Sequence, residues 1–313
     1  MAARSLTVVS HSPLISAPAP AETAILRTLL YADVFDYPLT PAEIHHYLIA
    51  ERATPDAVQA ALASSAWLAA RVTRVNGYFA VGGRAGTGPL RDERQRHSAA
   101  LWSLARRWAA RIGCLPFVRV VAVTGALAMD NSSAGDDIDF LIVAAPGRVW
   151  LARAMTIALV RVARLCGVGL CPNYVLSQSA LAQDRHDLFV AHDLAQMVPL
   201  VGHAVYAEMR AANEWVVELL PHARHPLHSE PELAPRNWLR ALQRLGERLL
   251  SGPLGDALEA WERRRKLRKF SSAARKPGSA ARLDADHVKG HFDDHGHSIL
   301  KEFEARVARY LSC

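Results

Sequence analysis

The segment VVAVTGALAMDNSSAGDDIDFLIVAAPG limits the fold of this chain more than any other stretch of its sequence. Its first apolar run ends at Thr124 and Gly125 and is followed by a short polar stretch. Three carboxylates, at Asp136, Asp137 and Asp139, then lead into a second apolar run. Short apolar runs bounded by turn residues are typical of buried strands, where carboxylates are unfavourable and repel one another. The pattern therefore predicts two strands joined by a turn, with a partner that offsets the negative charge.

The spacing of the acids indicates what that partner is. Residues i and i+2 of a strand point to the same face, so Asp137 and Asp139 are expected to be neighbours, opposite Ile138. Two carboxylates on one face at the exposed end of a strand suit a hard divalent cation such as Mg²⁺ or Mn²⁺. The alternative is a solvated strand entrance without a ligand, but Asp139 lies inside the apolar run rather than before it.

This arrangement resembles the polymerase-beta-like nucleotidyltransferase superfamily, in which a strand ending in Gly-Ser or Gly-Gly precedes a strand with Asp-x-Asp or Asp-x-Glu. Gly125, Asp137 and Asp139 match that pattern. The resemblance implies an α/β (α+β) fold with a mixed sheet and helices. It also implies Mg²⁺-dependent transfer of a nucleoside monophosphate from an NTP to an acceptor of unknown class (small molecule, protein or RNA), with release of pyrophosphate.

The same resemblance assigns roles to individual residues. Asp137 and Asp139 are the expected catalytic carboxylates and metal ligands, and Thr124, Gly125 and Ala126 form the turn expected to bind the nucleotide. A glycine at this turn leaves room for phosphate oxygens to approach backbone N–H groups. We therefore expect these five residues to form one site.

Residues 22–84 show a second pattern, that of a winged helix-turn-helix. Thr40, Pro41 and Glu43 form a capping box at one helix start, and a second Thr-Pro start follows it. An alternating segment turns at Asn76 and Gly77, a strong hairpin signal. The expected third helix carries no Lys or Arg, the side chains that most often contact DNA, so we predict a scaffold or partner-docking role rather than sequence-specific DNA binding. This N-terminal unit matches superfamily members that begin with a winged helix.

Two positions depart from the superfamily pattern. Ala126 replaces the usual Ser or Gly, and Asn173 stands on the expected strand LCPNYVLS where a third carboxylate is usual. An Asn carbonyl can bind a metal but cannot act as a base. Asp184 or Asp187 could substitute if the fold returns them to the site. The alternative function is a catalytically degenerate nucleotide-binding or regulatory protein whose winged helix contacts a partner or nucleic acid.

Length, charge and cysteine content indicate which partners, which location and which domains to expect. The chain has 313 residues and a net charge of +7, which favours anionic partners. Four cysteines without zinc-ligand spacing indicate a reducing, cytoplasmic location. The longest apolar segment, residues 149–171, carries three arginines, so no membrane partner is expected. We predict a disordered tail at 1–21, which is favoured over a signal peptide, the nucleotidyltransferase-like domain at 91–182 and a mainly helical region at 183–313.

Two further clusters remain open. The run RRRKLRK at 263–269 could bind phosphates or RNA, or be the solvated end of a helix. The segment DHVKGHFDDHGH combines histidines with acids, but its glycines interrupt a helix and it lacks zinc spacing. Polar contacts near the acceptor site, or a surface cap, are favoured over metal ligation for its members, which are His287, His291, Asp293, Asp294, His295 and His297.

Overall fold

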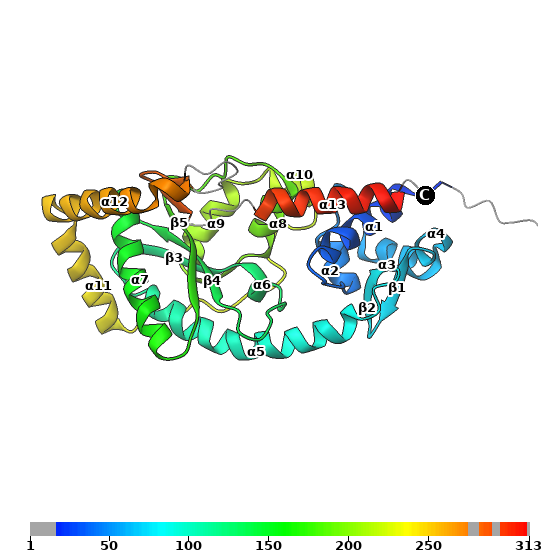
Figure 1. The fold of residues 1–313 in the computed structure, drawn as a ribbon, viewed down its shortest axis with the longest axis horizontal. Helices are drawn as coiled ribbons and strands as arrows, with labels where there is room; N and C mark the ends of the chain where they lie inside the picture. Colours follow the sequence, from blue (N-terminus) through cyan, green and yellow to red (C-terminus); the bar gives the residue numbers. More distant parts are fainter. Residues whose placement is uncertain (1–16, 275–281, 290–294, 312–313) are drawn as a thin grey trace, which may run out of the picture.

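The computed structural model describes residues 17–274, 282–289 and 295–311 (Figure 1). Helices and a six-stranded mixed sheet make the chain an α/β protein, as the sequence predicts. A smaller unit of helices and a two-stranded hairpin lies at the N-terminal end of the described chain. None of the described helices is long and apolar enough to cross a membrane.

The N-terminal unit forms where the helix-start and turn residues predict it. Its elements are α1 (Pro20–Asp33), α2 (Pro41–His46), α3 (Pro55–Ser64), α4 (Ala66–Ala69), β1 (Val72–Val75) and β2 (Tyr78–Val81). The capping box is confirmed, because the Thr40 side chain accepts from Glu43 N while the Glu43 carboxylate accepts from Thr40 N. Asn76 and Gly77 have φ of +52° and +85° and turn β1 into the antiparallel β2.

A long helix connects this unit to the sheet. It is α5 (Thr87–Ile112), which runs beneath both parts of the molecule in Figure 1. Near its start, Arg91 is buried and forms a bidentate ion pair with Glu43 of α2, with N–O distances of 2.7 and 2.8 Å. The two parts also meet where the Tyr37 hydroxyl donates to the Met129 carbonyl oxygen at 2.7 Å. These contacts hold the N-terminal helices against the sheet.

The sheet has the strand order β6-β3-β4-β5-β8-β7. Its strands are β3 (Val118–Val123), β4 (Ile138–Ala144), β5 (Leu170–Ser177), β6 (Val198–Val201), β7 (Arg282–Leu283) and β8 (His287–Lys289). The pair β4–β5 is parallel and every other neighbouring pair is antiparallel. Strands β6, β7 and β8 come from the region expected to be mainly helical, so the sheet extends beyond residues 91–182. These three strands have only two to four residues each, which is too short for an alternation of polar and apolar residues to be recognised in the sequence.

The remaining helices pack on the sheet or on other helices. They are α6 (Gly125–Ala128), α7 (Val149–Leu165), α8 (Leu188–Gln196), α9 (His203–Ala211), α10 (Val216–Leu219), α11 (Asn237–Leu250), α12 (Pro253–Ala274) and α13 (His295–Leu311). Helix α13 lies against α1 and α8. The run RRRKLRK lies within α12. Cys313, His291, Asp293, Asp294 and residues 1–16 lie outside the described residues.

Alternation along β4 divides the core into two layers. Phe140 and Ile142 pack with residues of α5 and α7 on one face. Leu141 and Val143 pack on the other face, in the cluster that includes the N-terminal helices and α8. Asp139 shares the parity of Leu141, so period-two geometry directs it toward this second face. The N-terminal helices therefore cover the end of the sheet that carries the predicted site.

Candidate functional site

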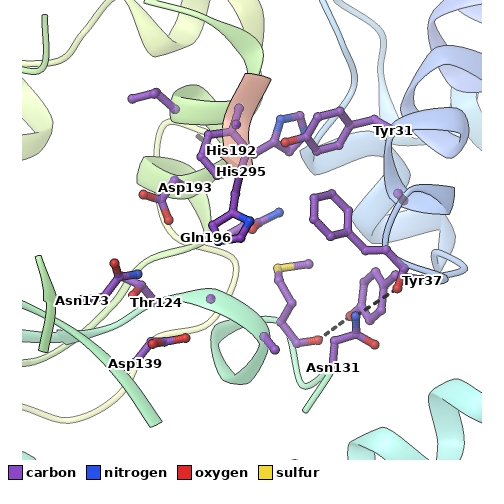
Figure 2. A pocket seen from close by; sticks show the side chains of 18 of the residues that line it. Tyr31, Tyr37, Thr124, Asn131, Asp139, Asn173, His192, Asp193, Gln196 and His295 are labelled. Atoms are coloured by element: carbon purple, nitrogen blue, oxygen red, sulfur yellow. Dashed lines mark hydrogen bonds between the residues drawn. The ribbon is translucent and has the colours of Figure 1, made fainter. Parts of the chain in front are cut away.

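A cavity of about 350 Å³ lies between the N-terminal helices and the end of the sheet (Figure 2). Its walls include all but one of the residues that the sequence analysis assigned to a site. The residues brought together are Thr124, Gly125, Ala126, Asp139 and Asn173. The tertiary structure thus joins the glycine turn, one carboxylate of the Asp-x-Asp pair and the strand residue that departs from the superfamily pattern.

Gly125 and Asp139 are in direct contact across β3 and β4. A Cβ on Gly125 would lie 2.7 Å from Asp139 Oδ2, closer than real Cβ atoms approach. The glycine also has a φ of +67°, a conformation that L side chains rarely adopt. Thr124 N donates to the Asp139 carbonyl oxygen at 3.0 Å, which fastens the turn to β4. Glycine is therefore required here both by backbone conformation and by the approach of the carboxylate.

The Asp139 carboxyl group is half-buried and close to other acids. Burial raises its pKa to about 6, and the negative charges of Asp137 and Asp193 add to the rise. The Cys171 thiol, whose own pKa is raised to about 12 mainly by burial, stays protonated and donates a hydrogen bond that opposes the shift. A group with these neighbours favours a bound cation or a proton.

Asp137 lies just before β4, which begins at Ile138, and its side chain is exposed. It does not line the cavity, although its charge acts on Asp139. A Cβ on Gly169, at the turn that precedes β5, would overlap Asp137 Oδ1 at 1.8 Å. The Asp137 carboxylate therefore packs against Gly169, and neither residue lines the cavity.

A second carboxylate in the cavity wall was missed by the sequence analysis. Asp193 of α8 lines the cavity, and burial raises its pKa while Lys289 of β8 opposes the rise. Figure 2 shows Asp193 on the same side of the cavity as Asp139 and Asn173. The available signal is one acid inside the apolar helix sequence LFVAHDLAQ. That signal does not say which residues the helix will face, so only the fold identifies Asp193.

Two neutral polar side chains complete this wall. Asn173 lines the cavity from β5, the strand parallel to β4. Thr124 is 4% exposed, and its Oγ1 has no hydrogen-bond partner among the described residues. Buried hydroxyl groups usually have a partner in protein, water or ligand. The unpaired Thr124 hydroxyl is therefore consistent with a polar ligand or water in the cavity.

Asp184 and Asp187, considered as substitutes for the third carboxylate, do not line the cavity. Asp184 pairs with Arg282. Asp187 pairs with Arg185 and caps α8, where its side chain accepts from Val190 N at 2.9 Å. Both acids therefore stabilise local structure in this conformation.

The opposite wall of the cavity is aromatic. It is formed by side chains of the N-terminal unit, namely Tyr31, Phe35, Tyr37 and Tyr47. Tyr31 stacks on His192 with ring centroids 3.9 Å apart. Burial lowers the pKa of His192 to about 4, so this ring is neutral near pH 7. Figure 2 shows Tyr31 and Tyr37 across the cavity from Asp139 and Asn173, so the cavity has a polar side and an aromatic side.

The described members of the His/Asp cluster separate. His287 is buried in β8 and contacts the Asp284 carboxylate through Nδ1 at 3.0 Å. His295, at the start of α13, lines the cavity with Lys289 and Arg185. The described residues contain no group of three or more His, Cys, Asp or Glu side chains placed to hold a metal ion. Lys289 and Arg185 therefore place cationic side chains in the same cavity as the acids Asp139 and Asp193.

Comparison with known proteins identifies no relative. No family model, curated protein or solved structure matches this chain.

Proposed function

We propose that this protein is a nucleotidyltransferase-like enzyme that transfers a nucleoside monophosphate from an NTP to an acceptor. The observation that carries the proposal is the contact between the Gly125 turn and the Asp139 carboxylate, at one end of a cavity that also contains Asp193. A glycine turn packed against an acid strand is the arrangement that the superfamily resemblance implies. The unpaired hydroxyl of Thr124 supports a polar ligand at the same turn.

The donor set is compatible with a hard divalent cation. Asp139, Asp193 and Asn173 each carry a side-chain oxygen that such a cation can bind, and the pKa of Asp139 is raised by burial and, to a lesser degree, by the nearby acids. Magnesium is usually held by one or two carboxylates together with substrate phosphates, so a larger protein ligand set is not required. When bound, Mg²⁺ or Mn²⁺ would neutralise triphosphate charge and polarise the α-phosphorus. We assign Asp139 as the principal ligand and the Asn173 carbonyl oxygen as a further donor, while Asp137 contributes through its nearby negative charge.

The remaining residues have distinct roles in this proposal. The backbone at Thr124, Gly125 and Ala126 binds the phosphates of the NTP. Asp193 replaces the carboxylate absent at position 173 and accepts the proton of the acceptor hydroxyl. Burial raises its pKa, and a more basic carboxylate is a better proton acceptor. Lys289, on the same wall, is placed to balance phosphate charge.

The aromatic wall supports recognition of a flat ring. Base stacking on aromatic side chains tolerates different bases, because every base has a π face. Tyr31 and Tyr37 therefore favour a nucleobase or an aromatic acceptor opposite the acids. We propose that the N-terminal unit is a winged helix that closes this site rather than one that reads DNA, because its α3 carries no Lys or Arg.

One observation favours the second function, a nucleotide-binding regulator without turnover. Position 173 is an amide, and the described residues assemble no group of three or more His, Cys, Asp or Glu side chains that could hold a metal ion. Such a protein would bind NTP and Mg²⁺ in the same cavity without releasing pyrophosphate. The two functions share the binding step and differ only in the chemical step.

The direct test incubates the full chain with Mg²⁺ or Mn²⁺ and each radiolabelled NTP in turn. Pyrophosphate release and label transfer to protein or to added acceptors are measured, together with NTP affinity by calorimetry. We expect metal-dependent binding that Asp139→Asn weakens strongly. Asp193→Asn should retain binding but reduce turnover by roughly a hundred- to ten-thousand-fold, the usual value of a positioned base.

The results separate the two functions. Binding with no pyrophosphate release for any NTP assigns the regulator, whereas release assigns the enzyme. An affinity unchanged in Asp139→Asn would refute both, because each function needs this cavity. Asp184→Asn is the matched control, since Asp184 is an exposed acid outside the cavity.

A further inference from the structure

Helix α11 has an inverted distribution of polar and apolar side chains. Its inner face is polar, since Gln243 donates to the carbonyl oxygens of Gly113 and Leu115 at 3.2 and 3.0 Å. Glu247 on the same face accepts from Phe117 N at 2.8 Å. An amphipathic helix of a globular protein normally buries its apolar face. Here the body of the protein holds the polar face, so the apolar face is turned outward.

The outward face of α11 is a continuous apolar stripe. Trp238, Leu242, Leu245 and Leu249 follow helical spacing, and more than half of the surface of each is exposed. In α12, Leu254 and Trp261 are similarly exposed, while the carboxylate of Glu259 faces inward and accepts from Trp150 N. We call these six exposed residues the α11–α12 surface. They are Trp238, Leu242, Leu245, Leu249, Leu254 and Trp261.

The two helices lie together at the end of the molecule away from the N-terminal unit (Figure 1). Of the ten large apolar side chains that are exposed in the described part of the chain, seven belong to residues 238–261. Large exposed apolar groups scattered singly need no explanation, but a concentration of them marks an interaction site.

Charge identifies the partner that this surface fits. The sequences of α11 and α12 contain nine Lys and Arg against four Asp and Glu. The acids already have partners within the protein: Glu247 pairs with Arg119, Asp256 with Arg148, Glu262 with Arg265, and Glu259 accepts backbone N–H groups. Arg244 and Arg248 are exposed, and their spacing places them on the flank of α11 between the stripe and the inner face. The outward charge is therefore positive.

We propose that the α11–α12 surface binds an anionic lipid bilayer, with α11 lying in the interface. Trp and Leu on one face with Arg beside them is the composition of helices that insert partway into lipid headgroups and attract anionic lipids. A second copy of the chain would bring the same cations together, which is unfavourable. A nucleic acid would engage the arginines but would leave the leucine stripe in water.

This mode of binding needs no membrane-spanning helix, and it differs from the sequence expectation of no membrane partner. It is independent of the proposed nucleotidyl transfer, because the surface and the cavity share no residue. Membrane binding at this end would leave the cavity, which lies between the sheet and the N-terminal helices, away from the contact.

The test is vesicle co-sedimentation of the full chain. Vesicles of phosphatidylcholine alone are compared with vesicles that also contain phosphatidylglycerol, at low and high salt. We expect binding to the anionic vesicles that weakens with salt. The double variant Trp238→Ser, Leu245→Ser should bind about tenfold or more weakly through lost apolar burial, and the double variant Arg244→Gln, Arg248→Gln by a similar factor through lost attraction to the anionic lipid.

Leu165→Ser is the matched control, because Leu165 is an exposed leucine of α7 outside the α11–α12 surface. The Leu165→Ser variant should bind vesicles as the unmodified protein does. Because the replaced side chains are exposed, every variant should keep the melting temperature of the unmodified protein. No binding to anionic vesicles, or equal binding by the Trp238/Leu245 variant, would overturn the proposal. A dimer that dissociates in the Trp238/Leu245 variant, in a protein that binds no vesicles, would assign the surface to self-association instead. Binding of DNA or RNA that only the arginine variant loses would assign it to nucleic acid.

Discussion

The Asp139 carboxylate occupies the space that a side chain at Gly125 would fill, with Oδ2 only 2.7 Å from the ideal Cβ position. Gly125→Ala must therefore displace either the turn or the acid, and it also strains a backbone with φ of +67°. We expect the strain to lower the free energy of unfolding by about 1–3 kcal/mol. If the protein is a transferase, displacement of the reacting groups should reduce turnover roughly a hundredfold. Chemical denaturation and the pyrophosphate assay measure the two effects.

Gly147→Ala is the control for that experiment. Gly147 has a similar φ of +71°, but a Cβ there would meet no atom within 4 Å. Its stability loss should be comparable, while NTP affinity and turnover stay unchanged. Equal NTP affinity in the two variants would show that the contact with Asp139 does not shape the site.

Asn173→Asp adds a carboxylate to the wall that already contains Asp139 and Asp193. We expect tighter divalent-metal binding and faster nucleotidyl transfer, because an anionic oxygen replaces a neutral amide oxygen. Calorimetry with Mn²⁺ and the pyrophosphate assay are the measurements. A lower rate in an enzyme that is already fast would mean that Asn173 is not where the third acid is missing. Asp193 would then already supply the third acid in full, as proposed above.

Arg91 and Glu43 are both buried and form a bidentate pair, and the Arg91 guanidinium also lies 4.2 Å from the Tyr37 ring centroid. Arg91→Met leaves a buried carboxylate without its cation. We expect a loss of about 3–5 kcal/mol in the free energy of unfolding, measured by denaturant titration. Adding Glu43→Gln should recover part of the loss, because it removes the isolated charge. Strictly additive losses would argue against coupling between the two groups.

His192 makes stability sensitive to acid. Burial lowers its pKa to about 4 in the folded protein, whereas an exposed histidine titrates near 6.5. As the pH falls through 6.5 the unfolded chain takes up a proton that the folded protein does not, so the free energy of unfolding decreases. Between pH 7 and pH 5 this contribution is about 2 kcal/mol. His192→Phe keeps a ring against Tyr31 and should flatten that part of the pH profile. An unchanged slope would exclude His192 as its source.

Local signals carried much of the fold. The Thr40–Glu43 capping box, the Asn76-Gly77 turn and the strand at Val118–Val123 form as predicted, and LCPNYVLS is the whole of β5. Each of these depends on interactions between residues close in sequence, or on an apolar run long enough to require burial. Gly125 and Asp139 could also be expected to meet, because Gly125 follows β3 and Asp139 lies in β4, and these two consecutive strands pair as antiparallel neighbours.

The sequence by itself therefore determined the helix starts, the principal strands and the residues of the glycine turn and acid strand. Only the tertiary structure decided that Asp193 enters the cavity, that tyrosines of the N-terminal unit form the opposite wall, and that β6 and β8 complete the sheet. It also decided that α11 directs its leucines outward, since the amphipathic pattern is the same whichever face is buried. These features depend on packing between segments far apart in the chain. Local propensity and periodicity carry no information about which distant surface a side chain will meet.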